Sequence, residues 1–476
     1  MTQAPDFAKL PPKLRSAMER IAFRAKNAGG RAWLVGGAVR DLVLGDRDIK
    51  DIDIEVFGIE PDRLKTLVGE DFAFDDCGAS FGVLKLKGLD IDVSLPRRES
   101  KESPGHRGFS IAADPTMPLR DAARRRDFTV NAIYADAITG ETADPYGGME
   151  DLSKKILRHV SERFTEDPLR VLRGMQFVAR FGLEPAQETI EVCRTMTTEN
   201  LAAERQMEEW TKLLVKGVEI SRGLEFLRAT GWVGHYPELA ALIGCEQAKE
   251  WHPEGDVWNH TLCCLNAFAR HRTGDRDEDL IVGLAVLCHD FGKPSTSVFD
   301  RAKGRITSKG HDIAGLEPAK SFIRRLTNEE RLVKEVLPLV KNHMRPFAMW
   351  KNKSSDSAVR RLAAEVVRID RLLRVAQADD EGRSPMPTEP EARMWLAERA
   401  EALRVADSAP KPILMGRHLL ELGMKPSPEF KKILNAAFSA QLDGKFIDLE
   451  GALKFLKCVR RANLESNAAP FRGTPL

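Results

Sequence analysis

The sequence predicts an α/β domain at the N-terminus and a mostly helical chain after it. The first signal is the short apolar run Trp33–Val35, which meets Gly36-Gly37 and continues as Ala38–Leu44 with apolar residues at helical spacing. This pattern indicates a strand, a tight turn and a helix. The second signal is the strict alternation of Asp51–Ile54, which is typical of a strand. The third is the helical spacing that dominates from Glu162 onward.

The other elements of the N-terminal domain follow in order. Leu14–Ala28 has helical spacing and stops at a Gly-Gly pair just before the first strand. Pro61–Leu67 is typical of a short helix, and Gly82–Leu86 with Leu89–Leu95 is typical of a β-hairpin. Arg97–Pro118 contains Pro, Gly and Ser without clean periodicity. We therefore expect a long loop there, either functional or an ordinary surface segment.

Length and composition bound the class of protein. The 476 residues are too many for one core, and about 150 residues per domain predicts roughly three or four units. With 73 Lys and Arg against 71 Asp and Glu, the net charge of +2 neither requires nor excludes nucleic acid. Seven cysteines without a Cys-x-x-Cys pair favour neither disulfides nor a zinc ribbon. No apolar run reaches the ~20 residues of a membrane span, so we expect a cytoplasmic protein without membrane association.

Two features of the N-terminal domain predict a phosphate-bearing ligand with a metal ion. Gly36 and Gly37 let the backbone approach a phosphate, and the helix after them brings free N–H groups and Arg40 to the same charge. Asp51 and Asp53 project from one strand face roughly 7 Å apart, which is costly unless a cation joins them. Oxygen ligands beside phosphates favour Mg²⁺. Either feature alone is more often structural, so the prediction depends on their combination.

Residues 33–57 resemble the head signature of class II nucleotidyltransferases, which include the tRNA CCA-adding enzymes and bacterial poly(A) polymerases. The resemblance implies a polymerase-beta-like catalytic head with a mixed sheet, in which Asp51 and Asp53 bind catalytic Mg²⁺ and the glycine turn with its arginine receives the triphosphate. In this family a third catalytic carboxylate can come from a later strand. Asp92, just before Leu95-Pro96-Arg97, fits that place, and an ordinary edge-strand aspartate is the alternative.

Later stretches extend the resemblance. Arg124–Ala132 looks like the second signature, in which an arginine and an aspartate contact the incoming nucleotide's phosphate and sugar; it implies these roles for Arg126 and Asp127. From the residues alone, we expect Asp127 to hold at least one of the three arginines before it. Asp144–Leu152 resembles the third signature, a hinge, and equally fits a simple turn that closes the domain. In CCA-adding enzymes a flexible loop at the place of Arg97–Pro118 helps to switch nucleotide choice.

Phe164–Arg173 opens a helix with a capping pattern, in which Thr165 is the expected N-cap. Asp167, Arg170 and Arg173 are spaced three apart, so the residues alone favour an ion-pair ladder. The family resemblance instead implies that an aspartate and an arginine so spaced hydrogen-bond the base of the incoming CTP or ATP. An acid accepts from the exocyclic amino group that C and A share, and arginine donates to ring or carbonyl acceptors. The resemblance therefore assigns base selection to Asp167 and Arg170, with Arg173 supporting the phosphates or the helix.

One position departs from the family pattern. Gln176 lies next on this helix face, where relatives commonly carry arginine, and this leaves a phosphate contact or the nucleotide preference open. Ala203–Leu214 is an amphipathic helix by its spacing. It resembles the family's last signature, a helix that supports the base-selecting one.

A second constellation lies farther along the chain. His260 precedes an apolar helix stretch, His289-Asp290 ends another helix, and Asp379 lies on a later one. A lone histidine there is usually a core residue, but the set resembles the HD phosphohydrolase pattern, including the HD domain of CCA-adding enzymes with cyclic phosphodiesterase and phosphatase activities. Imidazole with carboxylate favours Ni, Mn, Fe or Zn over Mg²⁺ alone, and such an ion activates water toward a phosphoester. His311 and His343 would support this ion or bind a second one.

These observations predict four regions: a nucleotidyltransferase head at 1–152, a helical neck with the base-selecting helix and a tRNA-binding region at 153–235, an HD phosphohydrolase-like domain at 236–385, and a helical region at 386–476. The predicted function is template-independent, Mg²⁺-dependent addition of C and A to the tRNA 3′ end from CTP and ATP, with release of pyrophosphate. The alternatives are a CC-only or A-only enzyme, a poly(A) polymerase, or an HD phosphohydrolase with an RNA-binding head. The sequence leaves monomer or dimer open.

Overall fold

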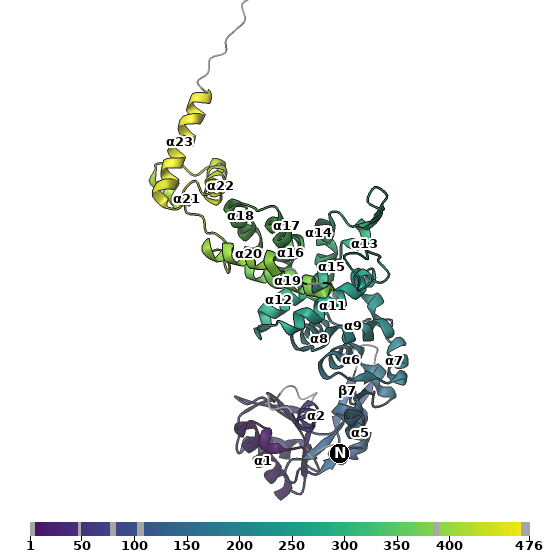
Figure 1. Cartoon of the computed structure of the whole chain (residues 1–476). Coiled ribbons are helices and arrows are strands. Elements are labelled where there is room, and N and C mark those ends of the chain that lie inside the picture. Colours follow the sequence, from purple (N-terminus) through teal and green to yellow (C-terminus); the bar gives the residue numbers. More distant parts are fainter. Residues whose placement is uncertain are drawn as a thin grey trace, which may run out of the picture. The chain divides into compact units, whose positions relative to one another are not determined.

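The structure is a computed structural model that describes residues 5–45, 49–76, 82–101, 109–383, 386, 388 and 390–467. The chain divides into two compact units, Met1–Pro237 and Glu238–Leu476. In Figure 1 the strands gather in the purple to blue N-terminal part, and the green to yellow part consists almost wholly of helices. This distribution confirms the predicted α/β head followed by helical regions.

A seven-stranded mixed sheet in the order β3-β4-β5-β2-β1-β8-β9 forms the centre of the head. β2 runs parallel to β5 and antiparallel to β1, so the strand with the Asp-x-Asp motif lies in the middle of the sheet. Alternate residues of β2 and β5, among them Ile54 and Val93, are buried. The strands are β1 (Arg31–Val35), β2 (Ile52–Phe57), β3 (Phe74–Asp76), β4 (Val83–Leu86), β5 (Ile91–Ser94), β8 (Tyr134–Asp136) and β9 (Thr142–Ala143).

Short helices accompany the sheet and confirm most of the predicted elements. The helices predicted at Leu14–Ala28 and Pro61–Leu67 are present, and β4 pairs antiparallel with β5 as the expected hairpin. Asp144 accepts hydrogen bonds from the backbone N–H groups of Gly148 and Met149, which forms the predicted turn. The helices of the head are α1 (Pro12–Asn27), α2 (Gly37–Leu44), α3 (Pro61–Gly69), α4 (Leu119–Arg124) and α5 (Gly148–Ser153), with 3₁₀ turns η1 (Phe7–Lys9) and η2 (Thr129–Asn131).

The prediction of a loop at Arg97–Pro118 is wrong for the described residues. β6 (Arg97–Lys101) and β7 (Phe109–Ala113) form an antiparallel ribbon in which Arg97 faces Ala113 and Lys101 faces Phe109. Residues 102–108 of the predicted loop lie outside the described part. The first strand reads Arg-Arg-Glu-Ser-Lys without an apolar residue, so hydrophobic alternation could not reveal it.

The remainder of the first unit is helical except for a two-residue parallel strand pair, β10 (Ile156–Leu157) and β11 (Glu184–Pro185). α6 packs against α8 and α9 around buried Trp210 and Phe226. The predicted amphipathic helix at Ala203–Leu214 is α8. These elements are η3 (Glu162–Glu166), α6 (Leu169–Phe181), α7 (Gln187–Arg194), α8 (Ala203–Lys216), α9 (Ile220–Ala229) and η4 (Trp232–His235).

The second unit is built around α12, whose residues from Asp279 to Cys288 are all buried. α11, α16 and α19 pack against this apolar helix, and its end therefore places His289 and Asp290 in the interior. A small antiparallel ribbon, β12 (Val298–Asp300) and β13 (Arg305–Thr307), is the one departure from an all-helical unit among the described residues. The helices are α10 (Pro237–Ala240), α11 (Val257–Arg270), α12 (Arg276–Cys288), α13 (Lys293–Thr296), α14 (His311–Ala314), α15 (Leu316–Leu326), α16 (Glu330–Asn342), α17 (Arg345–Lys351), α18 (Asp356–Val366), α19 (Ile369–Gly382), α20 (Pro390–Ala402), α21 (Gly416–Glu421), α22 (Pro428–Leu442) and α23 (Leu449–Asn467).

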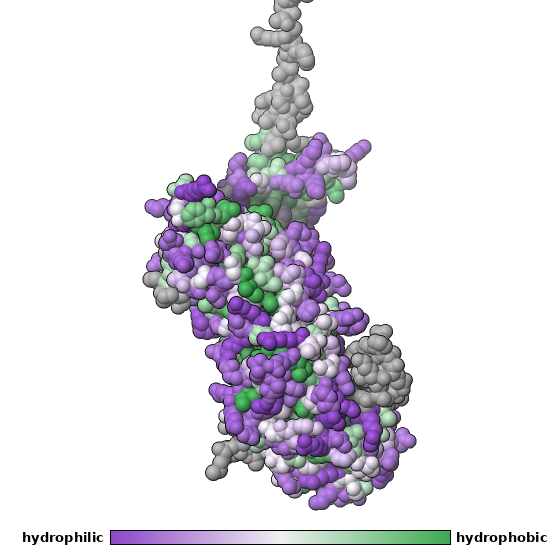
Figure 2. Space-filling view, turned by 90° about the vertical axis from the view of Figure 1, so that its right-hand side faces the viewer, coloured by the Kyte–Doolittle hydropathy of each residue, from purple (hydrophilic) through white to green (hydrophobic). Residues whose placement is uncertain are grey.

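On the face shown in Figure 2, apolar residues form small groups among hydrophilic ones. Within the described residues, no helix combines the length and the apolar content needed to cross a membrane.

Candidate active sites

Three carboxylates lie on or directly before two neighbouring strands of the head sheet. Asp53 in β2 stands in register with Asp92 in the parallel strand β5, and Asp51 directly precedes β2. Ile52 and Ile54 are buried while Asp51 and Asp53 are exposed, as the alternation predicts. Because residues two apart, and residues in register on adjacent strands, share a sheet face, all three predicted catalytic carboxylates lie on one face.

The charges of this group oppose one another. Desolvation raises the pKa of Asp53, and the negative charges of Asp92 and Asp51 raise it further, while the Arg126 guanidinium acts in the opposite direction. Lys85 Nζ lies 3.3 Å from Asp92 Oδ2 and neutralises part of the charge. Carboxylate oxygens that repel one another on a solvent-facing surface fit a hard divalent cation such as Mg²⁺.

The glycine turn lies directly beside these carboxylates. Gly36 has a φ of 75°, which favours glycine, and α2 begins at Gly37. A Cβ atom on Gly36 would lie 3.2 Å from Asp53 Oδ2 and 3.3 Å from Arg126 Nη1. The bare backbone of the turn therefore leaves the space between an acid and an arginine, next to the first N–H groups of a helix, open to a ligand.

Arg40 faces inward and is only 4% exposed. Its Nη1 donates to Asn131 Oδ1 at 2.7 Å, and its guanidinium lies over the Phe181 ring at 4.3 Å. A Cβ atom on Gly37 would lie 3.4 Å from Arg40 Nη2, so the guanidinium also borders the turn. Arg40 Nη2 also lies 2.7 Å from Asp41 Oδ1, so the guanidinium borders the turn from a fixed position as part of an ion pair.

The expectation that Asp127 holds one of the three arginines before it is wrong. Arg125 Nη2 lies 2.5 Å and Arg126 Nη2 3.7 Å from the fully buried carboxylate of Glu55, and Arg124 pairs with Glu162. Asp127 instead accepts from Arg173 Nε at 2.7 Å. The side chain of Asp127 turns toward α6, and this orientation cannot be read from adjacent residues.

The Asp127–Arg173 pair joins the end of the head to the helix predicted to select the base. Asp127 also accepts from Asn131 Nδ2 at 3.0 Å and from the Phe128 backbone N–H at 2.8 Å. Burial would raise the pKa of Asp127, but Arg173 and these hydrogen bonds lower it to about 2. The pair therefore stays ionised at neutral pH.

Asp167 and Arg170 do not form the ion-pair ladder that spacing alone favoured. Asp167 accepts from Arg205 Nη2 at 2.8 Å, and Arg170 donates to the carbonyl oxygens of Arg163 and Arg125 at 2.7 and 2.6 Å. Arg205 of α8 is a residue that the sequence did not single out, although it belongs to the stretch that resembles the family's last signature. Both predicted base-selecting side chains thus have partners outside the base-selecting helix, and Asp167 also accepts from the Leu169 N–H of that helix at 3.1 Å.

Two smaller expectations about this helix have clear outcomes. Thr165 is not the N-cap, because a 3₁₀ turn spans Glu162–Glu166 and α6 follows Pro168. Gln176 is buried, and its Oε1 accepts from Arg180 Nη1 at 2.9 Å. Arg180 therefore supplies an arginine on this face of the helix, one turn beyond Gln176.

The second unit brings four histidines together with one shared orientation. Each ring directs Nε2 into a common cluster and places Nδ1 against an acceptor of the protein. The Nδ1 acceptors are Glu254 Oε1 for His260 (2.7 Å), Val286 O for His289 (2.7 Å), Ser308 O for His311 (2.8 Å) and Val340 O for His343 (2.7 Å). These contacts orient each ring through Nδ1 and turn each Nε2 atom into the cluster, which is the arrangement of imidazole ligands around a metal ion.

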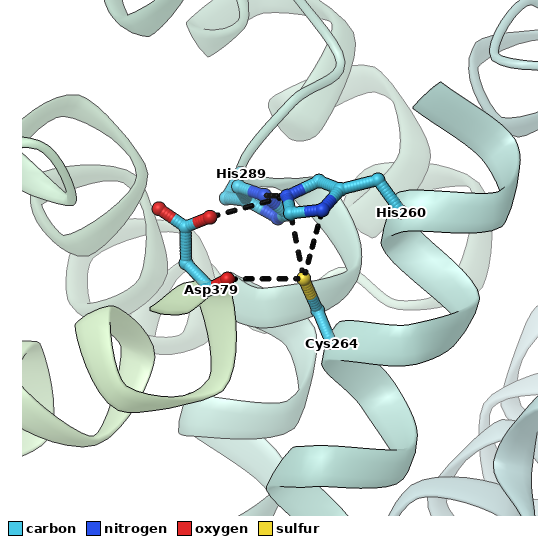
Figure 3. Close-up of side chains that lie close together, drawn as sticks. All are labelled: His260, Cys264, His289 and Asp379. Atoms are coloured by element: carbon cyan, nitrogen blue, oxygen red, sulfur yellow. Dashed lines mark hydrogen bonds and ion pairs between the residues drawn. The ribbon is translucent and has the colours of Figure 1, made fainter. Parts of the chain in front are cut away.

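The ligand atoms around His260 have the spacing of a metal site. His260 Nε2 lies 3.1 Å from Asp379 Oδ1 and 3.4 Å from His289 Nε2. Figure 3 shows these groups converging from three helices, with Cys264 Sγ 3.4 Å from His260 Nε2. Donor atoms bound at about 2 Å to one ion lie roughly 3 Å apart, so the distances fit.

Asp290 links this group to a second one. Its Oδ2 lies 3.2 Å from His289 Nε2, and its Oδ1 lies 3.5 Å from His311 Nε2, which is 3.2 Å from His343 Nε2. Burial would raise the pKa of Asp290, but His289 and Lys293, whose Nζ lies 2.7 Å away, hold it well below the usual range. Burial lowers the pKa of His343 to about 4, so this ring is neutral near pH 7, as a metal ligand must be.

Sequence reasoning missed four residues of this site. Cys264 follows His260 by one helical turn, a spacing that could have indicated it. Glu254 and His252 lie in the stretch just before α11, and Lys293 follows the His-Asp pair by three residues. Nothing in their spacing identifies these last three, because a loop and a buried turn place them.

A pocket of about 430 Å³ opens at the cluster. Asp290, Asp379, His311 and His343 line it. Its other lining residues include aromatic and cationic side chains: Trp251, Phe347, Arg305, Lys351, Arg383 and Arg393. The pocket can hold an anionic ligand that carries a planar group.

Comparisons with known proteins match both domains. Residues 32–158 match the poly A polymerase head domain, and residues 257–408 match the HD domain. A multifunctional CCA protein of Acinetobacter baumannii (strain SDF) is 31% identical over 423 residues, covering 84% of this chain and 98% of that protein. The chain belongs to the family of multifunctional CCA proteins. A second member, from Xylella fastidiosa (strain M23), is 34% identical over 369 residues, covering 74% of this chain and 84% of that protein.

Solved structures of the family share the fold. The Bacillus stearothermophilus CCA-adding enzyme in complex with CTP has a TM-score of 0.66 at 24% identity and covers 96% of this chain and 100% of its own. The Thermotoga maritima CCA-adding enzyme complexed with tRNA has a TM-score of 0.58 at 18% identity, covering 94% and 96%. Family membership identifies the chain as a nucleotidyltransferase that also carries an HD domain.

Proposed function

We propose that the head adds C and A nucleotides to the 3′ end of tRNA, using CTP and ATP and releasing pyrophosphate. The observation that carries this proposal is the convergence of Asp51, Asp53 and Asp92 beside the glycine turn. The three carboxylates would hold Mg²⁺. When bound, this ion lowers the pKa of the primer hydroxyl and neutralises charge on the leaving pyrophosphate.

Different residues around the carboxylates would bind the triphosphate and the sugar of the nucleotide. The N–H groups at Gly36 and Gly37 face the triphosphate, with Arg40 and Arg126 supplying positive charge. Asp127 would contact the sugar and at the same time accept a hydrogen bond from Arg173. The positive charge of Arg173 would support the phosphates.

Base selection is assigned to Asp167 and Arg170. Asp167 accepts from the exocyclic amino group of C or A, and Arg205 holds its carboxylate in place. Arg170 is tied to two carbonyl oxygens, so it must exchange one of them to donate to a base. Uracil and guanine present other donor and acceptor orders at the same positions.

The transferase proposal is tested with the double variant Asp51→Ala, Asp53→Ala. We expect loss of labelled CTP and ATP incorporation into a tRNA without its CCA end, while the HD activity stays. Undiminished incorporation by this variant would rule out the proposal.

Full CCA addition is proposed over CC-only, A-only or poly(A) synthesis because the relatives that cover most of the chain are multifunctional CCA proteins. The test uses tRNAs that lack three, two or one 3′ nucleotides, each with a single nucleotide. A full CCA enzyme extends the first two with CTP and the third with ATP. Failure at either nucleotide, or long A tails, would select one of the alternatives.

A second activity, metal-dependent phosphoester hydrolysis, is proposed for the HD domain. The observation that favours it is the set of four histidines whose Nε2 atoms converge near Asp290 and Asp379; both carboxylates, His311 and His343 line a pocket. His260, His289, Asp290 and Asp379 would hold a first Ni, Mn, Fe or Zn ion. His311 and His343 would hold a second ion with Asp290 between the two. The bound metal supplies an activated water for attack on phosphorus.

The double variant His289→Ala, Asp290→Ala tests this activity. We expect it to abolish hydrolysis of 2′,3′-cyclic AMP and of phosphomonoesters while nucleotide addition continues. Hydrolysis that survives the variant would place the activity elsewhere.

The predicted regions 1–152, 153–235, 236–385 and 386–476 are retained as part of this proposal. The first two would act together on the acceptor end of tRNA, and the fourth would extend the contact with tRNA or pack on the HD domain. Sedimentation of the purified protein would distinguish monomer from dimer.

A further inference from the structure

One buried carboxylate at the histidine cluster has no place in the HD pattern. Glu254 Oε1 lies 2.7 Å from His260 Nδ1 and 2.9 Å from His252 Nδ1. The Glu254 and His260 side chains are 3% and 1% exposed. We infer that Glu254 is a positioning residue that fixes His260 for metal binding, an inference that rests on the metal centre proposed for the HD domain.

His260 needs such a partner because of its place in a helix. His289 and His343 directly follow α12 and α16, where the last carbonyl oxygens lack a helical N–H donor, so Val286 O and Val340 O are free to accept from them. His260 lies in the first turn of α11, and its own N–H is bonded to Asp256 O. Carbonyl oxygens within a helix are already engaged, so a side chain has to orient this ring.

A carboxylate does more here than a carbonyl oxygen does. A hydrogen bond to an ionised acceptor is shorter and stronger than one to a neutral acceptor, and it increases the electron density at the opposite ring nitrogen. Among the four histidines, His260 is the one with a carboxylate on Nδ1. Its Nε2 is therefore the strongest imidazole donor of the cluster.

The loop that carries Glu254 is fixed where it enters α11. Asp256 caps α11 by accepting from the Asn259 backbone N–H at 2.9 Å. Gly255 has a φ of 123°, and a Cβ there would lie 2.8 Å from Asn259 Nδ2, so the chain passes into the helix only with glycine at this point. Gln247 donates to Gly255 O at 3.2 Å and accepts from Lys293 Nζ at 2.8 Å. The loop is thereby tied to the lysine that pairs with the central aspartate of the cluster.

His252 shares the same oxygen of Glu254 and packs against His260 at 4.7 Å between ring centroids, edge to face. It also lines the pocket. His252 therefore offers a test of whether the charge of Glu254 or the packing around His260 matters.

The experiment measures Co²⁺ binding to the full chain by visible absorption, with excess Mg²⁺ present to occupy the head carboxylates. The variants are Glu254→Ala, Glu254→Gln and His252→Asn. Asp279→Asn is the matched control, because it removes a buried carboxylate of the same unit that pairs with Arg374 away from the cluster. Thermal unfolding of the metal-free proteins is followed in parallel.

We expect Glu254→Ala to raise the Kd for Co²⁺ by about 10- to 100-fold, and Glu254→Gln to raise it less because an acceptor oxygen remains. Asp279→Asn should lower the melting temperature and leave the Kd unchanged, and His252→Asn should change the Kd less than about threefold, which is below the range expected for an orienting partner.

Three results would decide against the inference or against its basis. A Kd of Glu254→Ala equal to that of the natural chain, in a folded protein, would overturn the role of Glu254. Equal weakening by His252→Asn and Glu254→Ala would overturn it too, because packing would then explain the effect. Absence of Co²⁺ binding by the natural chain would instead contradict the proposed HD metal centre.

Discussion

The two sites of this chain hold charge in opposite ways. In the head, Asp53 and Asp92 lie on adjacent strands, Asp51 directly precedes the first of them, and the three negative charges repel one another. In the HD domain, helices surround the ligands, and His260 and His289 are each 1% exposed or less. The negative charges of the head site therefore oppose one another, whereas the HD cluster is already oriented by its own hydrogen bonds.

This difference follows from the elements that carry each site. A strand offers its side chains every second residue without using any of their polar atoms, so carboxylates in a sheet remain available to an exchanging ion. The end of a helix supplies free carbonyl oxygens, and these orient His289 and His343.

We expect the largest effect on nucleotide addition from substitution of the head carboxylates, and its size should differ between them. Asp53 lies between the other two carboxylates, so we expect Asp53→Asn to lower kcat for nucleotide addition at least about 10³-fold, equivalent to about 4 kcal/mol of barrier. Asp92→Asn should cost less, because Lys85 already neutralises part of its charge. Single-turnover incorporation of CTP measures both.

Asp75→Asn is the matched control for this series, because Asp75 lies on β3 of the same sheet and pairs with Lys87. It should leave the rate unchanged. A rate for Asp53→Asn within tenfold of the natural chain would show that the sheet carboxylates do not bind the catalytic ion.

An intermediate effect concerns the ion pair between head and neck. Asp127→Asn should lower the free energy of unfolding by about 2 kcal/mol at pH 7, because the pKa of Asp127 is about 2 when folded against an ordinary value of 3.8. A lowered folded pKa gives stability that is present above about pH 4 and lost as the pH falls toward 2. Urea unfolding of both proteins at several pH values measures the difference.

The two unfolding curves should therefore converge at acid pH. A difference that stays constant from pH 7 to pH 3 would mean that the charge of Asp127 contributes nothing to the fold.

The smallest effect concerns base selection. Arg205→Ala removes the partner of Asp167, and because both side chains are partly exposed we expect about a fivefold fall in kcat/KM for CTP and ATP, near 1 kcal/mol. Incorporation of UTP and GTP should rise relative to CTP and ATP. Arg222→Ala, which removes an ion pair with Glu219 in the same unit, is the control and should change neither value.

The sequence predicted that Asp51 and Asp53 share one face, because side chains two residues apart along a strand point to the same side. It placed Asp92 only through the family resemblance, since the pairing of β2 with β5 joins segments about 40 residues apart that no local pattern specifies. The ribbon of β6 and β7 escaped prediction because its first strand contains no apolar residue.

In the HD domain, too, the sequence showed the residues that belong to a local pattern and did not show those that a loop brings near. Adjacent His289 and Asp290 at the end of an apolar helix are visible in the sequence. Glu254 is not, because its contact with His260 depends on a glycine at a positive φ and on the path of a loop. The partners of Asp127 and Asp167 escaped prediction because both arginines belong to other helices.

The most direct test of two separate metal centres uses one preparation of the natural chain, stripped of metal by a chelator. Mg²⁺ alone should restore incorporation of CTP and ATP into tRNA and leave phosphoester hydrolysis near zero, and a small addition of Ni²⁺ or Mn²⁺ should then restore hydrolysis. If Mg²⁺ restored both activities together, or if neither ion separated them, the distinction between the carboxylate site and the histidine site would be contradicted.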